Sequence, residues 1–138
     1  MTKGILIFFS FFLLNHIAFG QNEFQTNYYD LVKQVRDIAK KANQPLKVSR
    51  NSFREEIFEL VKTTHRLQEE ALTEAIDHPN NEKVFADIAF GCKICDAILE
   101  SVDLKIKYNS KKYDSYIEKL KQIELAITIQ IKTQEKIK

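Results

Sequence analysis

Residues that break helices are almost absent from this chain, and their scarcity most strongly limits how it can fold. The 138 residues contain three Gly and two Pro. Beyond residue 20 only Gly91, Pro45 and Pro79 remain. Because Gly and Pro mark turns and end regular elements, this scarcity predicts a few long helices rather than many short strands.

Apolar residues recur at every third or fourth position over long stretches, which is the spacing of one helix face. We predict four helices, over residues of about 24–43, 52–77, 81–107 and 111–137. Ser52 and Glu55 form a capping-box pattern that predicts the start of the second helix. Short connections favour antiparallel neighbours. The sequence therefore predicts an all-α, up-down-up-down four-helix bundle, with a three-helix core and a looser first helix as the alternative.

The first twenty residues have the pattern of an export signal. Lys3 supplies the positive start, an apolar run follows, and Ala18 and Gly20 are the small residues that a signal peptidase requires. Polar Asn15 and His16 leave the run short of the roughly 18 apolar residues that span a bilayer. We therefore expect residues 1–20 to be cleaved, and residues 21–138 to form one periplasmic or secreted domain without a stable membrane anchor.

Charge is nearly balanced overall but unevenly distributed. Lys3 is the only charged residue before position 21, so 20 Lys and Arg remain against 19 Asp and Glu. This balance gives no reason to expect a nucleic-acid partner. The four predicted helices run basic, acidic, acidic and basic. The pattern either supplies complementary charge between neighbouring helices or forms a basic binding face, for which the candidates are Lys33, Arg36, Lys40, Lys111, Lys112, Lys119 and Lys121.

Cys92 and Cys95 form the one motif that could carry chemistry. Haem attachment is excluded because Asp96, not His, follows the second cysteine. A thioredoxin-like redox pair lies at a helix N-terminus, whereas helical apolar spacing continues on both sides of this pair. A disulfide between cysteines three residues apart is within reach with some distortion. The pattern favours a structural role, as two small apolar side chains in the core, either as thiols or as that disulfide.

A metal site is the competing interpretation of the cysteine pair. If the second and third helices pair about a turn near Pro79, His65 lies level with both cysteines. Thiolate and imidazole suit zinc or copper. A structural zinc site takes four ligands, however, and only Cys92, Cys95 and His65 are available. The sequence therefore predicts neither a metal nor a cofactor, and keeps these three residues as candidates.

No other pattern in the chain is typical of an active site. There is no glycine-rich phosphate loop, nucleophile elbow or HExxH motif. Glu124 interrupts the apolar seam of the last helix, and Tyr28 is expected at the edge of the core with its hydroxyl in solvent. We therefore expect a non-enzymatic protein that binds another macromolecule, most simply a protein, as an adaptor, a chaperone-like factor or an inhibitor. Self-association stays open, and a small metal-binding or thiol-redox protein is the alternative.

Overall fold

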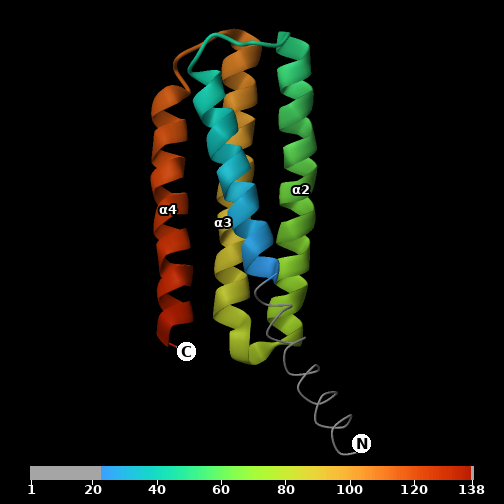
Figure 1. The fold of residues 1–138 in the computed structure, drawn as a ribbon, viewed down its shortest axis with the longest axis vertical. Helices are drawn as coiled ribbons and strands as arrows, with labels where there is room; N and C mark the ends of the chain where they lie inside the picture. The colour runs from blue at the N-terminus through green and yellow to red at the C-terminus, as the bar shows by residue number, and fades with distance from the viewer. Residues whose placement is uncertain (1–22, 138) are drawn as a thin grey trace, which may run out of the picture.

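The computed structural model describes residues 23–137, so the predicted signal peptide lies outside the described residues. Four α-helices make up almost all of this part of the chain, and no strand occurs in it. They are a first helix over residues 23–42, α2 (Arg50–Asp77), α3 (Glu82–Tyr108) and α4 (Asp114–Ile137), with the 3-10 turn η1 (Pro79–Asn81) between α2 and α3 (Figure 1). The predicted all-α class is confirmed.

The helices alternate in direction, so each runs antiparallel to the next along the chain. In Figure 1 the first helix rises to the connection that leads to α2, α2 descends, α3 rises and α4 descends. Ion pairs of the first helix with both α2 (Lys41 with Glu56) and α4 (Arg36 with Glu124) place it between them. The first helix also buries Leu31, Val35 and other side chains in the shared core. It is therefore a full member of a four-helix core, and the three-helix alternative is wrong.

The second helix begins earlier than its predicted capping box. Ser49 is the N-cap, and its hydroxyl oxygen accepts a hydrogen bond from the Ser52 amide at 3.1 Å. Ser52 therefore lies in the first turn, where it cannot act as the cap with Glu55. The predicted cap was wrong because two serines three residues apart both offer a capping oxygen, and the first of them meets the free amides at the helix start.

The last helix begins later than predicted, at Asp114 rather than near residue 111. Asn109 ends α3 in the left-handed conformation, with φ 48°. The amides of both Asn109 and Ser110 donate to the carbonyl of Lys105. This C-terminal cap turns the chain sharply, and residues 110–113 are used in the turn before the next helix starts.

Burial is concentrated on α3, which packs against both α2 and α4. Thirteen of its 27 residues are buried, against five of the 28 in α2. A large part of α2 therefore faces solvent. None of the helices described between residues 23 and 137 combines the length and the apolar character needed to cross a membrane.

Candidate functional site

A buried carboxylate links the first helix to α4. Glu124 is only 2% exposed, and its Oε2 accepts a hydrogen bond from Arg36 Nη2 at 2.9 Å. Its Oε1 accepts from the Tyr28 hydroxyl at 3.4 Å and from the Thr128 hydroxyl. A buried charge is tolerated when it is paired and hydrogen-bonded in this way. The interruption of the apolar seam is therefore a buried polar cluster that fixes the first helix against α4.

Tyr28 is fully buried, contrary to the expectation that its hydroxyl reaches solvent. Its ring lies against Gly91 of α3, where an added Cβ would stand 2.6 Å from Tyr28 Cζ and 2.8 Å from Cε1. The missing side chain of Gly91 makes room for the phenol ring. Burial, more than the nearby Glu124 carboxylate, raises the pKa of the Tyr28 hydroxyl, so it serves as a neutral hydrogen-bond donor.

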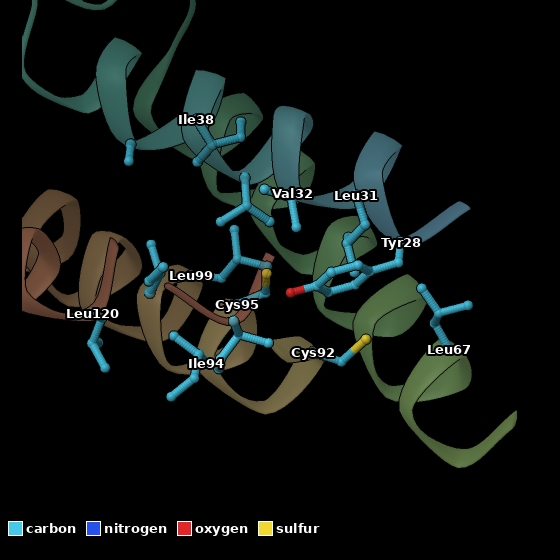
Figure 2. Close-up of a cluster of buried hydrophobic side chains, with 14 of the residues drawn as sticks. Tyr28, Leu31, Val32, Ile38, Leu67, Cys92, Ile94, Cys95, Leu99 and Leu120 are labelled. Carbon is cyan, nitrogen blue, oxygen red and sulfur yellow. The ribbon is translucent and has the colours of Figure 1, made fainter. Parts of the chain in front are cut away.

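Cys92 and Cys95 are buried as free thiols, and both are completely shielded from solvent. Figure 2 shows them among Leu31, Leu67 and other core side chains, with the Tyr28 hydroxyl pointing into the same region. Burial raises the pKa of the Cys92 thiol to about 12 and that of Cys95 well above its ordinary value. Reactive cysteines need an accessible thiolate. In this state the pair acts as two small apolar core residues.

The raised thiol pKa values predict a loss of stability in alkali. In the unfolded chain a thiol ionises near its ordinary pKa of about 8.5, whereas in the folded protein the buried thiol stays protonated to higher pH. The stabilising contribution of the buried thiol is therefore complete below about pH 8.5. For Cys92 the free energy of unfolding should fall between about pH 8.5 and about pH 12, by at most about 1.4 kcal/mol per pH unit. Chemical denaturation across this range should show a shallower decline in Cys92→Ala. An equally steep decline would show that another group causes it.

His65 does not join the cysteines. It lies on α2 with its side chain 57% exposed, and its Nε2 stands 3.1 Å from Asp96 Oδ1. His65 does lie level with the cysteines along the helix pair, as predicted, because its partner Asp96 directly follows Cys95. The cysteines face the core, however, whereas His65 faces outward. Among the described residues, no group of three or more His, Cys, Asp or Glu side chains is arranged to hold a metal ion.

An open groove of about 630 Å³ runs between α2 and α3. Its floor contains buried Ile57 and Leu99 together with half-buried Val61. Phe58 projects from one wall with 59% of its surface exposed, and Lys62 Nζ lies 4.9 Å from its ring centroid. A large aromatic side chain held in solvent beside an apolar floor is the geometry in which an aromatic or aliphatic anchor of a partner can be buried.

Acidic side chains surround this groove. Glu55, Asp96, Glu100 and Asp103 line it, against Arg54 and His65. Arg54 binds Asp103 through two hydrogen bonds, of 2.8 Å from Nε and 3.3 Å from Nη2, and this contact raises the pKa of Arg54. The groove lining thus holds four acids against Arg54 and His65, so acidic side chains are in excess. The α2–α3 groove therefore suits a segment with positive charge around an apolar residue.

The candidates for the basic face differ in the contacts that they make. Arg36 binds Glu124 and Lys121 pairs with Glu118 at 3.1 Å. Lys33 and Lys119 are exposed on the sides of the bundle. Lys40 lies in the last turn of the first helix, and Lys111 and Lys112 lie in the connection between α3 and α4. Arg36 and Lys121 are therefore paired with acids, while the other five bases are exposed, and the basic face stays a prediction.

Comparison of the chain with known protein families, with curated proteins and with solved structures finds no match. The sequence analysis missed the α2–α3 groove, because the residues that line it come from two helices and local spacing does not bring them together. The available clue was Phe58, a large apolar residue at helical spacing from the charged residues Glu55 and Lys62.

Proposed function

We propose that this is an exported, non-enzymatic helical bundle that acts by binding another protein through the α2–α3 groove. The observation that carries the proposal is the exposure of Phe58 beside an apolar floor with an acidic rim. A partner segment with one large apolar residue flanked by Lys or Arg matches this surface in shape and charge. An adaptor, a chaperone-like factor or an inhibitor would each use such a contact.

Chemistry at the cysteines or at Glu124 is less well supported. Both thiols are buried with raised pKa values, and the Glu124 carboxylate is buried and bound to Arg36. A general base or nucleophile must come within hydrogen-bond reach of its substrate. No dissolved substrate reaches these groups while the bundle is folded, so the geometry favours binding over catalysis or thiol redox chemistry.

Site-specific photocrosslinking in the producing cells tests this proposal. A photoreactive phenylalanine analogue at Phe58 should give one discrete protein adduct, because Phe58 lies at the edge of the proposed contact. The adduct should be found in the exported fraction, on a chain that begins at Gln21. Reversing the rim charge with Glu100→Lys should reduce the adduct severalfold, since the segment it attracts is positive.

Phe90 provides a matched control for the crosslinker. It is an aromatic residue on α3 with 51% exposure, close to that of Phe58, and it does not line the α2–α3 groove. The analogue at Phe90 should give no such adduct. Equal adducts from both positions, or none from Phe58, would rule out the groove as the binding site.

A further inference from the structure

The strongest concentration of positive charge lies at one end of the bundle. Figure 1 places the connection between the first helix and α2 at the same end as the connection between α3 and α4. A hydrogen bond from Lys105 Nζ to Asn43 Oδ1 joins the two. We call residues 40–50 and 105–113 the connection end. It contains no Asp or Glu, and its eight bases are Lys40, Lys41, Lys47, Arg50, Lys105, Lys107, Lys111 and Lys112.

Most of this charge is not neutralised by neighbouring acids. Lys41 Nζ lies 3.7 Å from Glu56, and Lys105 Nζ lies 2.6 Å from Asp114. The remaining six bases form no ion pair with any residue between 23 and 134, and all six are exposed. The far end of α2 is acidic instead, with Glu69, Glu70, Glu74 and Asp77. The connection end and the opposite end of α2 therefore differ in the sign of their charge.

Two exposed apolar side chains accompany the bases. Val48 is 52% exposed in the first connection, and Tyr108 is 60% exposed at the end of α3. Lys107 Nζ lies 5.3 Å from the Tyr108 ring centroid. Lysine beside tyrosine is typical of the boundary between water and lipid, where the ring enters the interface and the ammonium stays at the headgroups.

We propose that the connection end binds the surface of an anionic lipid bilayer. The bases contact the headgroups, and Val48 and Tyr108 enter the interfacial layer. A nucleic acid would satisfy the charge but offers no apolar layer for Val48, and an acidic protein would need an apolar patch placed among its acids to match both features. A bilayer offers both negative charge and an apolar layer beneath it, and its flat surface can be reached from both connections at once.

This contact should be reversible and sensitive to salt. A basic residue near an anionic surface increases partitioning by up to about fivefold. The attraction extends about 10 Å at 0.1 M salt and about 3 Å at 1 M. The protein should therefore be released from the bilayer at high salt, unlike one that inserts a helix.

Vesicle flotation of the protein as cells produce it tests whether the bases of the connection end bind anionic headgroups. It should float with phosphatidylcholine vesicles that contain phosphatidylglycerol, and much less with phosphatidylcholine alone. The triple variant Lys47→Gln, Lys111→Gln and Lys112→Gln should lose roughly ten- to a hundredfold in partitioning. The matched variant Lys33→Gln, Lys93→Gln and Lys119→Gln removes the same charge from the sides of the bundle and should lose under about threefold.

A fluorescence measurement tests the apolar contact. The chain contains no tryptophan, so Tyr108→Trp introduces a single reporter, whose emission should shift to the blue with the phosphatidylglycerol vesicles. Phe58→Trp should not shift, because Phe58 lies in the α2–α3 groove. Equal losses in the two triple variants, no shift at position 108, or binding to a soluble polyanion without binding to vesicles would each overturn the assignment to a bilayer.

Discussion

Replacing Arg36 with methionine should destabilise the protein by about 3 kcal/mol. The substitution keeps much of the apolar stem but leaves the Glu124 carboxylate buried without its cation, and breaking a buried pair in this way costs about 3–5 kcal/mol. We expect a cost at the lower end of this range, because the Arg36 side chain is 43% exposed. Water can therefore partly solvate the Glu124 carboxylate in place of the guanidinium. Denaturant unfolding followed by circular dichroism gives the free energy of unfolding.

The control for this prediction is Lys33→Met on the same helix. Lys33 is exposed and carries the same charge, but it does not contact Glu124, so its loss should change stability by less than about 0.5 kcal/mol. Adding Glu124→Gln to Arg36→Met removes the unpaired charge while an amide oxygen can still accept from Tyr28, and should recover most of the loss. Similar effects of the two single variants, or strict additivity in the double variant, would contradict the pairing.

Helix content and order could be read from the sequence because they depend on local spacing. The periodic apolar positions of α3, from Val84 to Ile106, are buried as that spacing implies. Boundaries were less predictable, because Ser49 and Ser52 are chemically equivalent candidates for the cap and only the folded chain decides between them.

The candidate sites depend on contacts between helices, which local spacing does not contain. Nothing near residue 124 in the sequence indicates that Arg36, 88 positions away, supplies its cation. The same limit applies to the connection end, since its two segments are separated by more than 50 residues and meet only through the antiparallel arrangement. For His65, the position along the bundle axis relative to the cysteines was predictable, but the direction of its side chain was not.

Replacing Gly91 with leucine should cost about 3 kcal/mol or more. A gain of up to about 1 kcal/mol in helix propensity opposes this cost. Overpacking costs about 1–3 kcal/mol in a core that can adjust, and here the obstacle is the Tyr28 ring, which is fully buried and bound to Glu124. The clash should therefore win. Ala86→Leu, at an exposed position of α3, should stay within about 0.5 kcal/mol.

The decisive comparison places Gly91→Leu in the Tyr28→Ala background. Removing the phenol ring leaves a cavity where the leucine can lie, so the second substitution should cost less than about 1 kcal/mol there or stabilise the protein. Coupling free energies between contacting residues are about 0.5–3 kcal/mol. We expect a value near the upper end for positions 28 and 91, because the two side chains compete for the same volume. If Gly91→Leu does not fold, Gly91→Ala gives the same cycle with a smaller clash. A cost that is the same in both backgrounds would show that Tyr28 is not what Gly91 accommodates.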